Sequence, residues 1–546
     1  MSSAQPTPQA HSGAAPDLDA LIVGAGFAGL YMLYRMRDVL GMNARVFERG
    51  NGVGGTWFWN RYPGARCDSE SFYYSYSFSP ELDQDWEWSS KYPEQPEILT
   101  YLNHVADRFD LRRDIQLSTC VVESRFDEAN DCWEVLTEAG ERITARFLIS
   151  AVGCLSAANM PEVEGLDQFE GDWHHTGDWP QQGVDFAGKR VGLVGTGSTG
   201  IQAAPVIAAQ ADHLTVFQRT ANYSIPTRNA RYTKEGWAEV TANYPETRRK
   251  VRASRAGFPY EAQDRSALSV SDKERTAIYE ELWSEGGFKF LWGSFNDLVT
   301  NLEANNTAAD FIRSKIRETV KDPEVAELLS PNDHPFAAKR PPIDTLYFET
   351  FNRDNVTLVD IRKSPIAEIT PHGLRTQDAE YELDTIVFAT GFDAMTGSLL
   401  KMGITGLDGC TLADKWADGP RTYLGLQVAG FPNLFTITGP GSPSVLTNMP
   451  VAIEQHVEWI SDCIDHMRKQ GFVRIDAQVE AQDKWVDHVS LVADVTLHKH
   501  ANSWYVGANI PGKKRVFMPY VAGLDTYSWL CTHVVNNDYE GFNLKS

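Results

Sequence analysis

The segment Gly24-Ala-Gly26-Phe-Ala-Gly29 decides the fold of the first part of the chain. It follows the apolar run Ala20-Leu-Ile-Val23 and precedes an apolar stretch typical of a helix. A strand, a tight turn and a helix in this order form the fingerprint of a dinucleotide-binding unit. The glycines permit the turn, let the backbone approach a pyrophosphate and seat the helix against the sheet, with the helix N-terminus facing the anion.

A second segment with the same pattern, Gly195-Thr-Gly197-Ser-Thr-Gly200, follows the apolar run Val191-Gly-Leu-Val194. One such segment is weak evidence, because glycine is common in turns. Two in the same context, with further β-like runs at Arg45-Val-Phe47 and Leu214-Thr-Val-Phe217, are far stronger. We therefore predict an α/β fold with two Rossmann-like, discontinuous dinucleotide-binding domains.

The residue nineteen positions after the last glycine is Glu48 in the first unit and Arg219 in the second. A carboxylate accepts hydrogen bonds from an adenosine ribose and repels a 2′-phosphate, so the first site suits FAD or NAD. A guanidinium matches a phosphate in charge and planar donor geometry, so the second site favours NADPH. The alternative for Arg219 is a solvated surface arginine.

Composition excludes several classes of protein. The 546 residues suffice for two or three domains, and the longest uncharged apolar run, Ala20 to Tyr34, is too short to span a bilayer. A formal net charge of −23 repels nucleic acid and anionic membranes, so we expect neither as a partner. NADPH is itself a polyanion and needs a local cationic pocket, for which Arg219, Lys339 and Arg340 are candidates.

Seven cysteines occur in an odd number and without a CxxC pair, which suits a reducing cytosol and leaves no dithiol for a reductase mechanism. We therefore expect a cytoplasmic protein, and no metal site is predicted. Residues 1–17 are rich in Ser, Ala, Pro and Gln and lack the features of a secretory signal, so they are predicted to form a disordered tail.

The stretch 228–335 is dense in charge and helical in period. Ser271-Asp-Lys-Glu274 has the pattern of a capping box, and Thr307 is placed to cap a helix with Ile312 and Ile316 on its apolar stripe. We predict a helical insertion here, between two parts of the NADPH-binding domain, 156–227 and 336–390. The FAD-binding domain would then comprise 18–155 and 391–546, the latter with a mobile C-terminal loop.

Two longer segments carry a family resemblance: GGTWFWNRYPGARCD at 54–68 and FEGDWHHTGDWP at 169–180. They resemble, at every defining position, the two diagnostic motifs of the type I Baeyer–Villiger monooxygenases, including Gly171, His175 and Trp179 in the second. Related N-oxygenating flavin monooxygenases resemble the second motif but lack its Trp-Pro ending. The resemblance covers the chain from about residue 18 to the C-terminus.

The resemblance implies FAD and NADPH as cofactors, with a ketone and O2 as substrates. NADPH would reduce FAD, the reduced flavin would capture O2 as a peroxide, and the peroxide would attack the ketone carbonyl. Migration of an adjacent carbon to oxygen would then give an ester or lactone. The protein would hold the cofactors in line and exclude water.

Arg340 matches the family's catalytic arginine, whose permanent charge can face the negative charge that builds during the reaction. Asp68 matches the carboxylate that pairs with this arginine, although the preceding Pro63-Gly64 also suits a turn or capping residue. His175 could suggest a general base because histidine titrates near neutral pH. The implied reaction needs no such base at the carbonyl, so we expect His175 to be a structural residue between the domains.

The remaining contacts follow from the fingerprints and the resemblance. Trp57 and Trp59 could line FAD or simply pack in the core, and Trp504 matches a residue that closes over the nicotinamide ribose on a mobile loop. The FAD contacts predicted are Gly24, Gly26, Phe27, Ala28, Gly29, Glu48, Gly55, Thr56, Trp57, Trp59, Asp68, Tyr74 and Met449. The NADP contacts predicted are Gly195, Thr196, Gly197, Ser198, Thr199, Gly200, Gln202, Arg219, Thr220, Lys339, Arg340 and Trp504.

Substrate identity is less sharply indicated. Residues 419–449 resemble the phenylacetone and steroid branch of the family, whereas the first fingerprint and the helical insertion resemble the cyclohexanone branch. We expect Val445 and Leu446 to line an apolar pocket for cyclic ketones, with tolerance for bulky or aromatic ones. The alternatives are an N- or S-oxygenating flavin monooxygenase and a nucleotide sensor without turnover, and a monomer or weak oligomer is expected.

Overall fold

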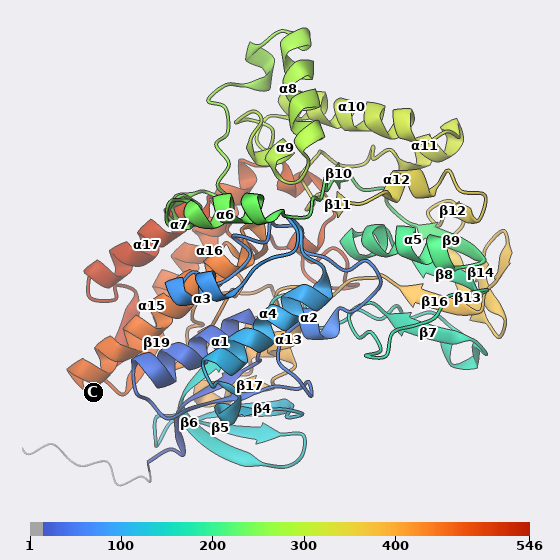
Figure 1. Ribbon diagram of the computed structural model, residues 1–546. Helices are drawn as coiled ribbons and strands as arrows, with labels where there is room; N and C mark the ends of the chain where they lie inside the picture. The colour runs from blue at the N-terminus through green and yellow to red at the C-terminus, as the bar shows by residue number, and fades with distance from the viewer. Residues whose placement is uncertain (1–14) are drawn as a thin grey trace, which may run out of the picture.

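Two sheets form the framework of the protein in a computed structural model that describes residues 15–546 (Figure 1). The eight-stranded sheet has the order β17-β4-β5-β6-β1-β2-β3, with β18 paired to β6, and the five-stranded sheet has the order β12-β9-β8-β16-β7. The first comprises β1 Leu18–Val23, β2 Ala44–Phe47, β3 Ile115–Gln116, β4 Val121–Asp127, β5 Cys132–Thr137, β6 Arg142–Ser150, β17 Ile404–Thr405 and β18 Leu434–Thr436. The second comprises β7 Asp172–His175, β8 Arg190–Val194, β9 His213–Gln218, β12 Val356–Asp360 and β16 Thr385–Phe388. This confirms the predicted α/β fold with two dinucleotide-binding units.

The first glycine segment turns the chain from β1 into α1 (Phe27–Tyr34). Strand β1 pairs in parallel with β2 and β6, and burial on both faces explains its apolar sequence. Gly24 has φ +106°, and a Cβ there would lie 2.6 Å from the carbonyl oxygen of Ala151. A Cβ on Gly29 would lie 1.8 Å from the carbonyl oxygen of Gly24, so this glycine lets the helix pack directly on the turn.

The second glycine segment repeats this geometry between β8 and α5 (Ser198–Gln210). Gly195 has φ +111°, and a Cβ on Gly200 would lie 2.1 Å from the carbonyl oxygen of Gly195. Strand β8 pairs in parallel with β9 and β16, and β9 pairs in parallel with β12. The carboxyl ends of these strands therefore meet at one edge, where α/β sheets bind ligands.

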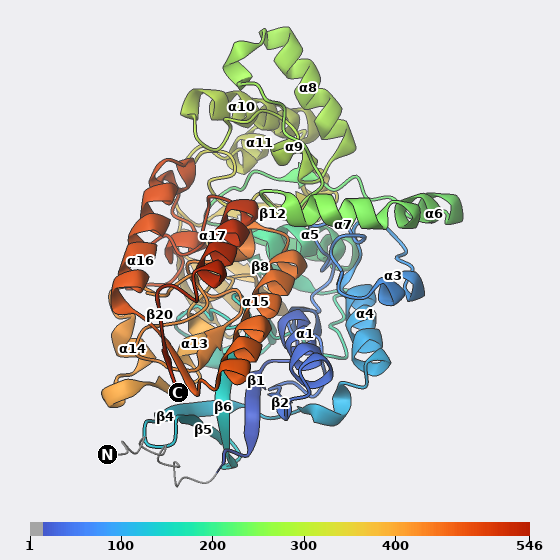
Figure 2. The same cartoon turned by 90° about the vertical axis from the view of Figure 1, so that its left-hand side faces the viewer.

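The helices between the two parts of the second sheet contact both units. In Figure 2, α8–α11 rise above the body of the molecule, whereas α6 and α7 lie across it. Apolar residues of α6 and α7 share a core with the first sheet, and those of α8–α11 share a core with α5. Their bounds are Lys234–Ala242 (α6), Tyr244–Ala253 (α7), Asp272–Glu285 (α8), Lys289–Trp292 (α9), Leu302–Thr319 (α10) and Pro323–Leu329 (α11).

Helix starts in this region are only partly as predicted. The Ser271 side chain caps α8 by accepting a hydrogen bond from the Glu274 N–H. The prediction that Thr307 caps a helix is wrong, because α10 begins five residues earlier and is capped by Asn301, whose oxygen accepts from two backbone N–H groups. Thr307 lies inside that helix, where its hydroxyl donates to the carbonyl of Ala304.

The chain passes between the two sheets along two segments that lie together. The first crossing runs from Gly153 to Pro161 and the second from Ala389 to Met395. They are joined by a β-bridge between Ala158 and Phe392 and by a hydrogen bond from the Asp393 N–H to the Ala157 carbonyl, 2.8 Å. The position of one sheet relative to the other therefore depends on how these two segments pair.

The ends of the chain complete the first unit. Helices α15 (Met449–Gln470) and α17 (Leu524–Asn536) pack on its core, and α16 (Val479–Asp494) lies beside them (Figure 2). Most of the predicted N-terminal tail, residues 1–14, lies outside the described residues, and Asp17 accepts two hydrogen bonds from Thr144. Among residues 15–546, no helix is long and apolar enough to cross a membrane, and all seven cysteines are free.

Candidate active site

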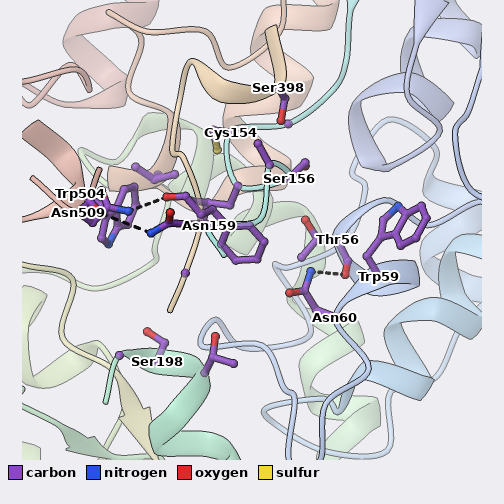
Figure 3. Close-up of a pocket in the computed structure, with 18 of the residues that line it drawn as sticks. Thr56, Trp59, Asn60, Cys154, Ser156, Asn159, Ser198, Ser398, Trp504 and Asn509 are labelled. Atoms are coloured by element: carbon purple, nitrogen blue, oxygen red, sulfur yellow. Dashed lines mark hydrogen bonds between the residues drawn. The ribbon is translucent and has the colours of Figure 1, made fainter. Parts of the chain in front are cut away.

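A single large cavity of about 1,560 Å³ lies between the two sheets, and both glycine segments open into it. Pockets for one ligand usually measure roughly 300–1,000 Å³, so this cavity has room for more than one small molecule. Figure 3 shows its walls: Thr56, Trp59 and Asn60 on one side face Trp504, Asn509 and Asn159 on the other, with Ser198 below. The junction of the two units is thus the site to which most predicted residues converge.

The wall formed by the first unit fits a dinucleotide. Helix α1 begins without a side-chain cap and without an acidic residue in its first turn, so its N–H groups are open to an anion. The backbones of Gly26 and Gly55 approach so closely that a Cβ on Gly55 would lie 2.9 Å from the Gly26 Cα. A flat, side-chain-free surface at a helix N-terminus is what a pyrophosphate requires.

Glu48 stands at the end of β2 and is buried. Its two carboxylate oxygens accept hydrogen bonds from the N–H groups of Ala25 and Gly50, each at 2.7 Å. A carboxylate has about four acceptor positions, so capacity remains on the side that lines the cavity. The backbone bonds hold the acid in the place where a ribose acceptor is expected.

Trp57 and Trp59, the aromatic residues predicted to line FAD or pack in the core, lie in α2 (Thr56–Trp59), and both line the cavity. Trp57 is buried in the core, donates to the Tyr74 hydroxyl at 3.2 Å and also lines the cavity. Trp59 lines the cavity from a position under the Arg49 guanidinium, 4.3 Å from the ring centre. Met449, at the start of α15, completes this wall.

The wall formed by the second unit carries a group of neighbouring cations. Helix α5 also begins with neither a side-chain cap nor an acidic first turn. Arg219 and Thr220 follow β9 and line the cavity with Lys339. Burial lowers the pKa of Lys339, Asp333 opposes this, and the neighbouring charges of Arg219 and Arg362 lower it further. Mutual repulsion of this kind is relieved when an anion binds between the cations.

Arg362 is a site residue that the sequence prediction missed. It follows β12, which pairs in register with β9, and the Ile361 N–H donates to the Gln218 carbonyl at 3.0 Å. Arg219 and Arg362 are thus placed at the ends of adjacent strands. The closest acidic atoms to the Arg362 guanidinium, on Asp333 and Asp360, are 3.6 Å and 3.7 Å away. To predict Arg362 from the sequence, one would have to know that β9 pairs with β12, a strand far away along the chain.

Three of the predicted cofactor residues have structural contacts of their own. Gln202 lines the cavity, but its side-chain oxygen accepts from the Tyr62 hydroxyl at 2.8 Å and its amide N–H donates to the Arg66 carbonyl. It therefore joins α5 to the first motif. Gly29 and Gly200 lie under their turns and are not part of the cavity wall in the described residues, because each one seats a helix on the backbone.

Arg340 and Asp68 form an ion pair where the two units meet. The Arg340 Nε lies 2.7 Å from Asp68 Oδ2 and its Nη2 lies 3.0 Å from Oδ1, while Nη1 donates to the Val445 carbonyl at 2.7 Å. The Phe288 ring stacks 4.7 Å from the guanidinium carbon. Burial disfavours the charged arginine, but the attraction and hydrogen bonds of Asp68 outweigh it and raise its pKa. The charge therefore persists at any pH at which the protein is folded.

The C-terminal loop carries Trp504 and Tyr505 at the junction of the two units. Trp504 lines the large cavity, and Tyr505 is buried beside Arg340. Burial and the charge of Asp68 raise the pKa of Tyr505 to about 12, although Arg340 opposes the shift, so its hydroxyl keeps its proton. Leu446 does not line the large cavity in the described residues. It lies in an adjoining hollow whose wall also includes Arg340 and Tyr505. The large apolar side chains of that wall belong to Phe258, Phe288, Leu291, Trp292, Val299 and Tyr520.

His175 ends the edge strand β7 and is buried. Its Nδ1 accepts a hydrogen bond from the Gly177 N–H at 3.0 Å, and its ring packs against Phe392 of the second crossing. Burial lowers the pKa of His175, so the ring is neutral at pH 7. In the same motif the Trp179 N–H donates to the Trp59 carbonyl at 3.3 Å, which ties the second motif to the first.

Two glycine-turn units that face one cavity, with an acid after one strand and an arginine after the other, define an oxidoreductase built to use two dinucleotides. A family model described as pyridine nucleotide-disulphide oxidoreductase matches residues 21–273. That match covers both glycine segments and the start of the helical insertion.

Comparisons over the full length identify the family. The chain is 47% identical to a Baeyer-Villiger monooxygenase of Pseudooceanicola batsensis, over 94% of this chain and 93% of the relative. It is 43% identical to the phenazine N-monooxygenase PhzNO1 of Lysobacter antibioticus, over 97% of each chain. A solved structure of an oxidized steroid monooxygenase bound to NADP superposes with a TM-score of 0.92 at 53% identity, covering 97% of this chain and 99% of that chain. The protein belongs to the Baeyer–Villiger monooxygenases.

Proposed function

We propose that this protein oxidises ketones to esters or lactones with NADPH and O2. The observation that carries the proposal is the position of the Arg340–Asp68 pair, between the two glycine-turn units and on the boundary between the large cavity and the apolar hollow. The permanently charged Arg340 side chain there lines both the large cavity and the adjoining hollow. That is the arrangement a reaction needs when negative charge develops between a cofactor and a carbonyl.

Each wall of the cavity would hold its own cofactor. Residues of the first unit would hold FAD, with Gly26 and Gly55 under the pyrophosphate and Glu48 at the adenosine ribose. Residues of the second unit would hold NADPH, with Arg219, Thr220 and Lys339 at the 2′-phosphate. A bound FAD would supply the redox chemistry, namely acceptance of a hydride from NADPH and activation of O2.

The protein's own groups then position and shield the reacting atoms. Arg340 stabilises negative charge by electrostatics, since its pKa forbids proton transfer. Asp68 and the Val445 carbonyl hold the guanidinium in one direction. Trp504 and Tyr505 cover the site and exclude water, which strengthens every charge interaction inside it.

The hollow beside Arg340 favours an apolar ketone. The hollow measures about 50 Å³, and Arg255, Thr447 and His498 line it beside aromatic and aliphatic residues that include the predicted pocket residue Leu446. A space of this size holds only part of a ketone, so we propose that cyclic ketones, with bulky or aromatic ketones also accepted, lie mainly in the large cavity and place an apolar part in the hollow. The similarity to a phenazine N-monooxygenase favours N-oxygenation as a second candidate.

A panel of cyclic, aryl and steroid ketones, together with aromatic amines and sulfides, would test the proposal. The purified protein should carry FAD, consume NADPH faster when a ketone is present, and yield an ester or lactone with one oxygen atom from 18O2 on mass spectrometry. Oxygenation of nitrogen or sulfur with no ester from any ketone would replace the proposal with the second candidate.

A further inference from the structure

Glu70 is a buried carboxylate that has no part in the proposed reaction. It lies two residues after Asp68, and its side chain is 7% exposed. Three donors converge on its Oε1 atom: the Lys91 Nζ at 2.9 Å, the Tyr260 hydroxyl at 3.0 Å and the Tyr92 hydroxyl at 3.5 Å. A buried carboxylate needs such partners, because burial of an unpaired charge is costly. Glu70 therefore ties its own segment of chain to two others.

A further tyrosine extends this group of contacts. Burial and the charge of Glu70 raise the pKa of Tyr260, so its hydroxyl keeps its proton and donates a hydrogen bond to Glu70. A tyrosine hydroxyl has a single proton, so in the 2.7 Å contact between the Tyr73 and Tyr260 hydroxyls the donor is Tyr73. We call Glu70, Lys91, Tyr73, Tyr92 and Tyr260 the Glu70 cluster.

One side of the Glu70 cluster reaches the hollow beside Arg340 through Phe258. The Tyr260 ring stacks on the Phe258 ring, with the two centres 5.8 Å apart and an angle of 8° between the planes. The Tyr73 ring meets Phe258 edge to face at 5.7 Å. Phe258 lines the hollow, so a side chain in its wall packs against two rings whose hydroxyl groups belong to the cluster.

Another side of the cluster reaches the hollow through Phe288. The Tyr92 hydroxyl lies against the backbone of Gly287, where a Cβ would be 1.8 Å from the hydroxyl oxygen. The next residue, Phe288, lines the hollow and stacks 4.7 Å from the guanidinium carbon of Arg340. The Phe288 and Phe258 rings also pack together, with their centres 5.5 Å apart. A shift of the Tyr92 hydroxyl would therefore move the ring that covers Arg340.

We propose that Glu70 is a positioning residue that sets the shape of the hollow, and that it thereby selects between the two products of a substrate that can react in two orientations. In the described part of the chain Glu70 lines neither the large cavity nor the hollow, so it acts through Phe258 and Phe288. This role rests on the proposed function in so far as a substrate places an apolar part beside Arg340.

The ratio of two lactones from one ketone tests the role on the intact flavoprotein. A cyclohexanone with a β-phenyl group gives one lactone or the other, according to which ring carbon migrates. Glu70→Gln keeps the shape of the side chain but removes the charge that holds Lys91 and strengthens the bonds from the tyrosine hydroxyls. We expect the ratio, measured by gas chromatography, to change about tenfold, which is the size of effect that one methylene has in an apolar pocket.

Two matched controls accompany a second variant. Tyr260→Phe keeps the ring but removes the hydroxyl, so it should change the ratio in the same direction. Tyr279→Phe removes a different buried hydroxyl of the helical insertion, one that bonds to Thr307 at 2.8 Å. Glu285→Gln breaks a Glu–Lys pair close to Phe288 in the chain whose side chains are 40% and 39% exposed. Both controls should keep the native ratio.

A purely structural role for Glu70 gives a different result. It would lower the melting temperature and the FAD content of Glu70→Gln, but the protein that still holds FAD would form the two lactones in the native ratio. That result in Glu70→Gln and Tyr260→Phe, or an equal change of ratio in Tyr279→Phe or Glu285→Gln, would overturn the positioning role. Should Glu70→Gln fail to fold, Tyr260→Phe and Tyr92→Phe decide the matter.

Failure of the proposed function is recognised separately. If no ketone is oxidised, the same variants are compared on methyl phenyl sulfide, which gives two sulfoxide enantiomers. A changed enantiomer ratio in the cluster variants alone would support the role of Glu70, and a native ratio would overturn it. If neither substrate is converted, hydrogen exchange decides: peptides that contain Phe258 and Phe288 should exchange faster in Glu70→Gln but not in Tyr279→Phe, and equal exchange would overturn the role.

Discussion

Asp68 and Arg340, 272 positions apart in the chain, meet through two parallel hydrogen bonds of 2.7 and 3.0 Å. The pair leaves one guanidinium nitrogen, Nη1, for the Val445 carbonyl, and the Phe288 ring covers a face of the group. The direction of the charge is therefore set by the protein before any ligand arrives, which is the condition for electrostatic stabilisation without reorganisation.

The first prediction concerns this pair. Asp68→Asn keeps the shape of the side chain but removes its charge and turns an amide N–H toward the guanidinium. We expect kcat for ketone oxidation to fall about 10- to 100-fold, which corresponds to the roughly 1.5–3 kcal/mol of a hydrogen bond to a charged group. Arg340→Ala should cost on the order of 10²–10³ in kcat, because the donor itself is lost.

Steady-state kinetics on variants with full FAD content, checked by absorbance, would measure these losses. Glu94→Gln is the control, since Glu94 pairs with Arg66 of the same motif at 2.7 Å but at an exposed position. A native rate in Asp68→Asn, or an equal loss in Glu94→Gln, would show that the orientation of Arg340 does not limit the reaction.

The second prediction concerns the cations at the ends of β9 and β12. Arg219→Gln should raise KM for NADPH about 10- to 100-fold, because one charge-assisted contact with a phosphate is lost. Arg362→Gln should raise it about threefold, a smaller effect because its side chain is 42% exposed and solvent screens the charge. KM for NADH should stay constant in both variants.

The control for this pair is Lys363→Gln, which removes the same charge one residue away at an exposed position. If Lys363→Gln raises KM for NADPH as much as Arg362→Gln does, the effect comes from the general field of a protein with net charge −23 and not from a contact.

The glycine segments and Arg362 show which features the sequence can predict and which it cannot. The glycine segments can be recognised because the local backbone requires residues without a Cβ. Gly24 and Gly195 have positive φ and lie against backbone oxygens. Both units and the α/β fold follow from such requirements. Arg362 could not be recognised in this way, because its role depends on the pairing of β12 with β9 across the whole helical insertion.

The sequence also could not predict which side chains contact each other where the two units meet. The resemblance assigned Gln202 to NADP, and the structure adds that its amide is bonded to Tyr62 and Arg66 of the other unit while the residue lines the cavity. Contacts between segments hundreds of residues apart depend on how two units dock, and local propensity carries no information about docking.

The third prediction concerns the apolar hollow. Leu446→Ala should enlarge it, so kcat/KM for bulky aryl ketones should rise up to about tenfold relative to cyclohexanone, given roughly 1–3 kcal/mol for small changes in an apolar pocket. Leu302→Ala is the control, since Leu302 begins α10 and is half exposed. Competition between the two ketones in one reaction, followed by gas chromatography, gives the ratio directly. An unchanged ratio would remove Leu446 from the substrate pocket.

The fourth prediction is a pH dependence of stability at Asp344, the last residue of β11 (Ile343–Asp344), which pairs with β10 (Ile225–Pro226). Burial raises the pKa of this carboxyl to about 6 from an ordinary value of 3.8, although the Ser224 hydroxyl and the Tyr347 N–H bond to it. The folded protein therefore binds more protons here than the unfolded chain does between these two values. This contribution to stability is complete below pH 3.8 and is lost as the pH rises through about 6.

Asp344→Asn removes the titrating group, so its melting temperature relative to the native protein should be higher at pH 8 than at pH 5. The free-energy difference between the two pH values should be about 1.4 kcal/mol, because pH 5 lies about one unit below the folded pKa of about 6 and one pKa unit is worth about that much. Asp354→Asn, an exposed change in the same part of the chain, is the control and should shift both melting temperatures equally. Parallel pH profiles for the native protein and Asp344→Asn would mean that the buried carboxyl stays ionised in both states, held by its two hydrogen bonds.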